Sequence, residues 1–483
     1  MEFIFDVEKM IYGGAGLGRL GGKVVFVPFT VPGDRVKVEV HQEKRDFIEA
    51  RLLEIISPST FRTQPFCPLF GRCGGCHYQH IAYGEQIRLK EEILQEFLSR
   101  KLKAKNFDFL PMIPSPRDRS YRIRAQFKVG TWEGEKVLGF YATHSHRVIP
   151  IEACPLLHPL AQELLQTLQA WWNQEKGPFS IQGIDIQVSP DEGRGVVAIK
   201  AKGKGSFSSL EQLARKSALL KGIAWEGNPP WTWGDVTLLY QGVADGTDPP
   251  IRYQALYRSF IQVNPDQNRN LIHTLMQWAE LTGREWVLDL YCGAGNLSLP
   301  LARRSSRLWG IDRDEGAIAS ARENAKRNGL AHADFMAATA RGGLLRLKEE
   351  IPRLDVAVMD PPRAGAQEIL PLLASLRPER IFYISCNPST LIRDLAKLEG
   401  MGYDMKRIRG LDMFPQTYHM EAIAELQRRD SKAEVCGCAE NRRKERGSVN
   451  DHLGDWRGRI HRFPFGGSTF EGRPSGDGFG QFR

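Results

Sequence analysis

The sequence lacks the features that direct a chain into a membrane or out of a cell. None of its 483 residues lies in an apolar run of about 18, the length that a membrane-spanning helix needs. Its start, Met1–Glu8, lacks the basic residues that open a secretory signal peptide. We therefore expect a cytoplasmic protein with no membrane contact. In that reducing compartment the eight cysteines should be metal ligands, catalytic thiols or buried core residues and not disulfides.

The chain also lacks the complete glycine pattern of a dinucleotide-binding loop. A buried strand predicted at 287–290 leads into a turn with Gly293 and Gly295, which is typical of a nucleotide-binding sheet. The dinucleotide pattern requires Gly or Ala where this loop has Ser298, so another adenosine-containing ligand is favoured over a nicotinamide cofactor. A second match, Gly16-Leu-Gly18-Arg-Leu-Gly21, precedes a strand and not a helix, and we interpret it as a barrel turn.

Further predicted strands end in side chains that are able to bind ligands or to react. Apolar runs are followed by Asp312, Asp360 and Cys386. Ligands of open parallel sheets bind beyond the carboxyl ends of the strands, so we expect these residues to converge with Tyr291. Asp312 is placed to accept both ribose hydroxyls; alternatively it caps the following helix, for which Asp314 is better placed.

These segments together resemble a known enzyme family. The motifs Asp289-x-x-Cys-Gly-x-Gly, Asp360-Pro-Pro-Arg, Ser385-Cys-Asn-Pro and Phe414-Pro-Gln-Thr-Tyr-His-Met-Glu421 occur in the order typical of RNA uracil-C5 methyltransferases that use S-adenosylmethionine. The resemblance implies an α/β fold, a class I methyltransferase doubly wound sheet. It also implies that Cys386 and Glu421 are catalytic. The implied cofactor-binding residues are Gln262, Tyr291, Gly293, Gly295, Asn296, Asp312 and Asp360.

The chemistry of uracil explains why a cysteine and a carboxylate are needed. C5 of uracil is a poor nucleophile until a thiolate adds to C6, which we expect Cys386 to do. Glu421 is the implied base that removes the C5 proton, while Asp360 orients either the uracil edge or the cofactor amine. The alternatives are that Cys386 is a small buried residue at a strand end, that the chain binds RNA with an inactive methyltransferase fold, or that it methylates cytosine.

Four cysteines form a second constellation. Cys67, Cys73 and Cys76 lie close together in the sequence, and Cys154 is the fourth candidate. Soft thiolates suit zinc or an iron–sulfur cluster. Cys73-Gly-Gly-Cys76-His77 also matches a haem-attachment motif, but attachment requires export. The chain resembles the cluster-bearing branch of the family, in which these four cysteines would hold a [4Fe–4S] cluster.

The domain organisation follows from these landmarks. Residues 1–57 resemble the TRAM domain, a small OB-like RNA-binding β-barrel. Residues 58–255 contain the cysteines and an α+β central insertion that we expect to grip RNA, and residues 256–429 form the methyltransferase domain. Residues 430–483 have too little apolar content to fold and should be disordered.

The charge distribution points to RNA. The net charge is +9, and Arg88–Lys128 contains eleven Lys and Arg against five Asp and Glu. In Arg117–Arg124, which we predict to be a strand, basic residues alternate with other residues. Arg122 and Arg124 should therefore bind phosphates. A solvated helix face over 88–105 is the plainer alternative. A barrel together with a cluster resembles the branch of the family that acts on 23S ribosomal RNA. We therefore expect a monomeric enzyme with 23S ribosomal RNA as its partner, with the T-loop of transfer RNA as the alternative.

Overall fold

The structure is a computed structural model that describes residues 1–102, 106–174, 180–202, 207–242 and 249–429. The chain divides into two units, Met1–Arg428 and Arg429–Arg483, and every element below belongs to the first. The tail that we expected to be disordered, residues 430–483, lies outside the described residues. Within the described ranges, no helix is both long and apolar enough to cross a membrane.

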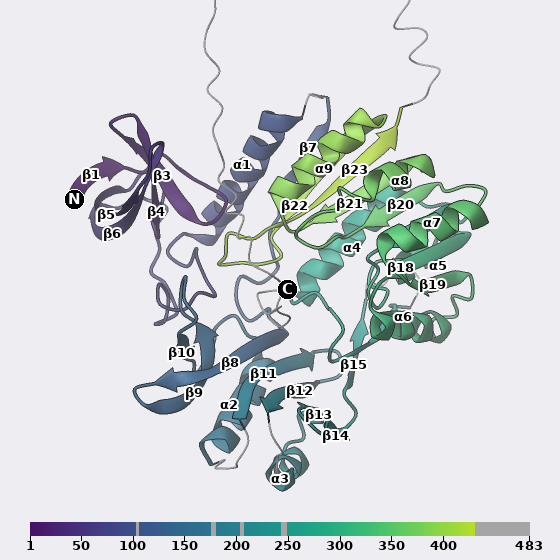
Figure 1. The fold of residues 1–483 in the computed structure, drawn as a ribbon, viewed down its shortest axis with the longest axis horizontal. Helices are drawn as coiled ribbons and strands as arrows, with labels where there is room; N and C mark the ends of the chain where they lie inside the picture. The colour runs from purple at the N-terminus through teal and green to yellow at the C-terminus, as the bar shows by residue number, and fades with distance from the viewer. Residues whose placement is uncertain (103–105, 175–179, 203–206, 243–248, 430–483) are drawn as a thin grey trace, which may run out of the picture. The chain divides into compact units, whose positions relative to one another are not determined.

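The N-terminal segment folds as a six-stranded, almost entirely antiparallel sheet, which confirms the predicted small barrel (Figure 1). Its inward side chains, including Val25, Val27, Val36 and Val38, form a core of their own. In chain order its strands are β1 (Glu2–Asp6), β2 (Lys9–Met10), β3 (Ala15–Leu20), β4 (Lys23–Pro28), β5 (Arg35–Glu43) and β6 (Phe47–Ser57), arranged as β1-β5-β6-β4-β3-β2.

Glycines of the rejected dinucleotide pattern lie mostly inside a strand and not in a turn. Gly16 and Gly18 belong to β3, where a Cβ atom would approach Thr30 Oγ1 to 2.1 Å and the Phe5 ring to 2.4 Å. These two glycines therefore allow close packing across the barrel, and only Gly21 forms the predicted turn. Strand β4 follows Gly21, which confirms that a strand and not a helix comes after this pattern.

The central region is a seven-stranded sheet covered by two helices. Its core combines sheet residues such as Ile184 and Val197 with Leu164 and Leu168 of the helix α2. The elements are β8 (Arg124–Trp132), β9 (Glu135–Tyr141), β10 (Val148–Pro150), α2 (Pro159–Gln174), β11 (Ser180–Ser189), β12 (Arg194–Lys202), α3 (Ser208–Lys216), β13 (Leu220–Glu226) and β14 (Trp231–Gly234), followed by the pair β15 (Thr237–Gln241) and β16 (Arg252–Leu256).

The C-terminal region is built on an eight-stranded sheet in the order β19-β18-β17-β20-β21-β23-β22-β7. All neighbouring strands run parallel except β23, which is antiparallel to β21 and β22. The strands are β7 (Asp108–Ile113), β17 (Trp286–Leu290), β18 (Arg307–Asp312), β19 (Ala333–Ala337), β20 (Val356–Met359), β21 (Arg380–Ser385), β22 (Tyr403–Leu411) and β23 (Glu421–Arg428).

Helices cover both faces of this sheet. Leu288 and Ile381 belong to one apolar cluster and their neighbours Val287 and Phe382 to the other, as expected of strands buried on both faces. One face is covered by α1 (Tyr83–Lys101), α7 (Ala340–Glu350), α8 (Leu370–Ser375) and α9 (Pro388–Gly400), and the other by α4 (Pro265–Ala279), α5 (Ser298–Arg303) and α6 (Glu315–Arg327) (Figure 1).

Two sequence-based boundaries differ from the structure. The predicted central region 58–255 includes α1 and β7, but β7 pairs with β22 in the C-terminal sheet and α1 packs beside α9. The basic strand predicted at Arg117–Arg124 is also wrong, because strand β8 begins only at Arg124 and Arg122 makes a single isolated bridge to Leu157. Alternating charge alone did not reveal that Arg122 and Tyr121 are tied to other segments.

Candidate active site

The glycine loop after β17 has the backbone geometry that its sequence predicts. Gly293 and Gly295 have φ angles of 53° and 95°, in the left-handed region that favours glycine. Tyr291 also has a positive φ, of 64°, and its N–H donates to Ile311 O at 2.8 Å. The loop lies at the carboxyl end of β17, between β18 and β20, where the strand order of the sheet reverses. Open α/β sheets bind their ligands at such a point.

The carboxylate of Asp312 supports this loop from the neighbouring strand. It accepts a hydrogen bond from Gly293 N–H at 3.0 Å and another from Asp314 N–H at 2.9 Å. Asp314, and not Asp312, caps α6, because its side chain accepts from Ala317 N–H at 2.9 Å. The structure therefore excludes the helix-cap alternative for Asp312.

Three carboxyl groups gather at this end of the sheet. Asp289 is 1% exposed and accepts a short hydrogen bond from Ser298 Oγ. Burial raises the pKa of Asp289 to about 7; the hydrogen bond opposes this, while the charges of Asp360 and Asp312 add to it. Its Oδ1 has no hydrogen-bond partner among the described residues. A buried carboxyl with a free oxygen suits a cationic ligand group.

The two remaining candidate cofactor residues lie at the start of α4 and α5. Asn296 forms a reciprocal amide pair with Asn268 of α4, with N···O distances of 2.8 and 2.9 Å. Gln262 is half-buried, two residues before Asn264, which caps α4. Asn268 has no motif around it in the sequence, and only the fold reveals that it holds the glycine loop against α4.

Cys386 and Glu421 stand at the same end of the β21–β23 pair. The antiparallel register ends with Ser385 opposite Ala422, Cys386 directly follows Ser385, and Glu421 directly precedes Ala422. The thiol is half-exposed between β21 and α9, whereas Glu421 is 2% exposed. The N-terminus of α9 follows Cys386 directly, and a helix N-terminus favours a thiolate. A thiol and a buried carboxyl group therefore lie at the edge that carries the glycine loop.

The loop before Glu421 is held by side chains of α1. Gln86 accepts from Gln416 N–H at 3.0 Å and donates to Gln416 Oε1 at 3.0 Å. Lys90 forms an ion pair with Asp412 at 2.6 Å in which both side chains are fully buried, and it also donates to Phe414 O at 3.2 Å. Burial lowers the pKa of Lys90, which the charge of Asp412 opposes. Sequence patterns did not identify either α1 residue.

Arg363 of the Asp-Pro-Pro-Arg motif lies beside the segment that follows Cys386. Its carbonyl accepts hydrogen bonds from Asn387 Nδ2 and Thr390 Oγ1, both at 3.1 Å, and its guanidinium lies 3.4 Å from His419 Nδ1. Asp360 and Cys386 directly follow the adjacent strands β20 and β21. The segments that follow these two residues are therefore hydrogen-bonded to each other.

Comparison with known proteins identifies the fold and the family. Residues 243–429 match the family described as tRNA (Uracil-5-)-methyltransferase, and residues 6–53 match the TRAM domain. An uncharacterized RNA methyltransferase of Halalkalibacterium halodurans is 34% identical over 447 residues, which cover 87% of this chain and 96% of that protein. Another, from Caldanaerobacter subterraneus, is 32% identical over 446 residues, 88% of this chain and 98% of the relative. The chain belongs to the RNA uracil-5-methyltransferase family.

A solved relative supports the assignment. The Pyrococcus abyssi tRNA (uracil-54, C5)-methyltransferase in complex with S-adenosyl-L-homocysteine has a TM-score of 0.69 and 25% identity, covering 88% of this chain and all of that one. The predicted class I methyltransferase fold, the enzymatic activity and S-adenosylmethionine as methyl donor are thereby confirmed. The alternative of an RNA-binding protein without enzymatic function loses its support.

The four cysteines of this family member come together from two segments. The Cys73–Ala142 bridge brings the first segment beside β9, and burial raises the pKa of Cys73 to about 11. Burial also raises the pKa of Cys76, to which the charges of Cys154, Cys73 and Cys67 add. In the part of the chain that the structure describes, no three His, Cys, Asp or Glu side chains are arranged to hold a metal ion. The donor chemistry suits an iron–sulfur cluster, but the thiols are not in a coordinating arrangement.

The two predicted RNA-binding arginines are partly occupied within the chain. Arg124 donates to Ser259 O at 3.1 Å, and burial lowers its pKa. The Nε of Arg122 donates to Arg124 O at 3.3 Å. Both side chains are half-buried and hydrogen-bonded within the chain.

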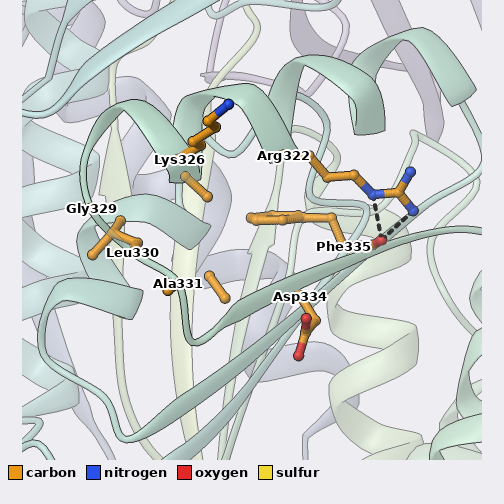
Figure 2. A pocket seen from close by; sticks show the side chains of 9 residues that line it. Arg322, Lys326, Gly329, Leu330, Ala331, Asp334 and Phe335 are labelled. Atoms are coloured by element: carbon orange, nitrogen blue, oxygen red, sulfur yellow. Dashed lines mark hydrogen bonds between the residues drawn. The ribbon is translucent and has the colours of Figure 1, made fainter.

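A surface pocket of about 520 Å³ lies away from this site. It is lined by the end of α6 and the start of β19, at the opposite end of the strands from the glycine loop. Figure 2 shows the Arg322 side chain directed to Phe335 O, to which it donates two hydrogen bonds of 3.1 and 2.6 Å. The guanidinium of Arg322, one of the cationic groups that line the pocket, thus already has a hydrogen-bond acceptor within the protein.

Proposed function

We propose that this enzyme methylates C5 of a uridine in RNA through a covalent bond between Cys386 and C6 of the base. The proposal rests chiefly on one observation: Cys386 and Glu421 flank the paired residues Ser385 and Ala422, at the same end of the β21–β23 pair. A nucleophile and a base that act on adjacent ring carbons must lie close together.

The two residues divide the reaction between them. The Cys386 thiolate adds to C6, and the electron pair released into the ring makes C5 nucleophilic. S-adenosylmethionine supplies the electrophilic methyl group that C5 takes up. Glu421 then removes the C5 proton, the ring double bond re-forms, and the thiolate leaves. Because the target base must reach a pocket at a sheet edge, it has to leave its stack in the RNA.

The cofactor residues are assigned by their places around the glycine loop. Gly293 and Gly295 let the backbone approach the ligand, Asp312 accepts from the ribose hydroxyls with its remaining lone pairs, and Asp289 faces the cationic groups. Tyr291, Asn296 and Gln262 complete the site. Asp360 contacts either the uracil edge or the cofactor amine, and uracil analogues with altered edges distinguish these roles.

A covalent complex is the direct test of this chemistry. Wild-type enzyme incubated with 5-fluorouridine-containing RNA and S-adenosylmethionine should give a protein–RNA band that survives denaturation, because fluorine cannot leave as the proton does. Cys386→Ala should give none, while it still binds cofactor. A covalent band in Cys386→Ala would show that Cys386 is not the nucleophile that adds to C6.

We propose 23S ribosomal RNA as the substrate. We also propose that the four cysteines bind a [4Fe–4S] cluster whose assembly draws their thiols into a coordinating arrangement, because thiolates are the ligands that such clusters prefer. The barrel at 1–57 and the central region at 58–255 supply the RNA surface, including Arg122 and Arg124. Transfer RNA is the second candidate, because the solved relative from Pyrococcus abyssi is a tRNA methyltransferase. Mapping the 5-methyluridine that disappears from total RNA when the gene is deleted separates the two. Loss from the T-loop of transfer RNA would overturn the ribosomal assignment.

A further inference from the structure

The turn between β2 and β3 carries a tyrosine from the N-terminal barrel to the catalytic residues. The hydroxyl of Tyr12 donates to the backbone carbonyl of Cys386 over 3.4 Å. Its ring packs edge-on against Tyr418, with centroids 5.4 Å apart, and against Phe97 of α1 at 5.9 Å. The charges of Cys386 and Glu421 both act on the phenol. A residue far away in the sequence thus contacts the backbone of Cys386 and packs against Tyr418, three residues before Glu421.

Several independent contacts fix this turn in place. Gly14 has a φ of 88°, and a Cβ atom there would lie 3.3 Å from both His77 Cβ and Tyr418 Cδ1. Lys9 forms an ion pair with Glu96 of α1 at 2.6 Å. Met10 is 3% exposed and belongs to the large apolar cluster that includes residues of α1 and α9. The turn is therefore packed into the methyltransferase core and is not a free edge of the barrel.

We propose that Tyr12 is a positioning residue for Cys386, so that the N-terminal barrel completes the active site. This inference rests on the proposed role of Cys386 as the nucleophile. The Cys386 peptide joins β21 to α9, and its orientation sets the direction of the Cα–Cβ bond that aims Sγ at C6. A hydrogen bond to its carbonyl fixes the plane of that peptide.

The chemistry of the phenol suits this task. Burial raises the pKa of Tyr12 far above its ordinary value, and the charges of Tyr418 and Cys386 add to the effect. The hydroxyl therefore remains a neutral donor while the thiol and the carboxyl beside it change charge. A barrel that only recruited RNA would need no side chain at the catalytic thiol.

The test compares two tyrosine hydroxyls. Tyr12→Phe removes only the hydroxyl near Cys386. Tyr403→Phe is the matched control, because Tyr403 is also buried and donates to a carbonyl, that of Pro378 at 3.0 Å, away from the active site. Full-length proteins are compared in single-turnover methylation of RNA and in KM for RNA, and melting curves verify that both variants fold.

We expect Tyr12→Phe to lower the single-turnover rate by about threefold to tenfold, the usual net worth of one hydrogen bond. KM for RNA should change by less than the rate does, and Tyr403→Phe should leave both parameters unchanged. An unaltered rate in Tyr12→Phe, equal losses in the two variants, or a change confined to KM would each overturn the inference. Absence of a covalent RNA complex in the wild type would instead indicate that the proposed function has failed.

Discussion

The buried carboxyl of Asp289 should make cofactor binding depend on pH near neutrality. Its pKa is raised to about 7, chiefly by burial. S-adenosylmethionine carries a sulfonium and an ammonium group, which the ionised carboxylate attracts and the protonated one does not. With a pKa of about 7, the ionised fraction rises from about one tenth at pH 6 to about nine tenths at pH 8. Taken alone, this ionisation should lower the apparent Kd for the cofactor by about tenfold over this range.

Calorimetric titrations at pH 6, 7 and 8 measure this dependence directly. Asp289→Asn is the control, because the amide keeps the size of the side chain and a hydrogen-bond acceptor for Ser298 Oγ, but has no charge to lose. The ammonium of the cofactor has an ordinary pKa of about 8, so it titrates as well and weakens binding at high pH. In the Asn variant only this opposite trend should remain. Parallel pH profiles for the two proteins would refute the role of Asp289.

The raised pKa of Asp289 also predicts how the stability of the cofactor-free protein depends on pH. Its pKa is higher in the folded state than the ordinary value of 3.8, so the folded chain binds more protons between about pH 4 and pH 7. The contribution of Asp289 to the free energy of unfolding should thus decrease as pH rises through that window, by about 1.4 kcal/mol per unit at most, and level off above it. Asp289→Asn should flatten the melting temperature between pH 5 and pH 7.5 relative to the wild type.

Three further experiments test the other assignments. Glu421→Gln should slow turnover by about 10²–10⁴-fold, because the base is lost, and should accumulate a methylated covalent RNA complex through Cys386; slow turnover without that complex would return Glu421 to a structural role. Arg122→Ala should weaken RNA binding and lower its salt-dependence slope by about one unit, whereas Arg124→Ala should change the slope less; equal effects would show that the Ser259 contact does not restrain Arg124. Anaerobically purified protein should be brown and Cys73→Ser colourless, and a zinc-containing colourless wild type would contradict the cluster.

The motif-bearing strands could be predicted because buried parallel strands are continuous apolar runs with chemistry only at their ends. The strand predicted at 287–290 is β17 (Trp286–Leu290), and strands β20 and β21 end directly before Asp360 and Cys386, as expected. The prediction for Arg117–Arg124 failed because alternation of charge resembles a half-exposed strand, whereas the backbone there bonds to Pro155 and Leu156. Partners so remote in the sequence leave no local pattern.

Lys90 illustrates why the supporting residues of the site escaped prediction. In a basic helix a lysine indicates a solvated face, yet Lys90 and Asp412 are both fully buried and paired. Removing one partner of such a pair typically costs about 3–5 kcal/mol, since the other charge is left buried alone. The helix α1 and the loop before Glu421 therefore stabilise each other only when both are folded. The position of Glu421, the proposed base, is thus supported by a contact that spans more than three hundred residues, and no motif near Glu421 encodes it.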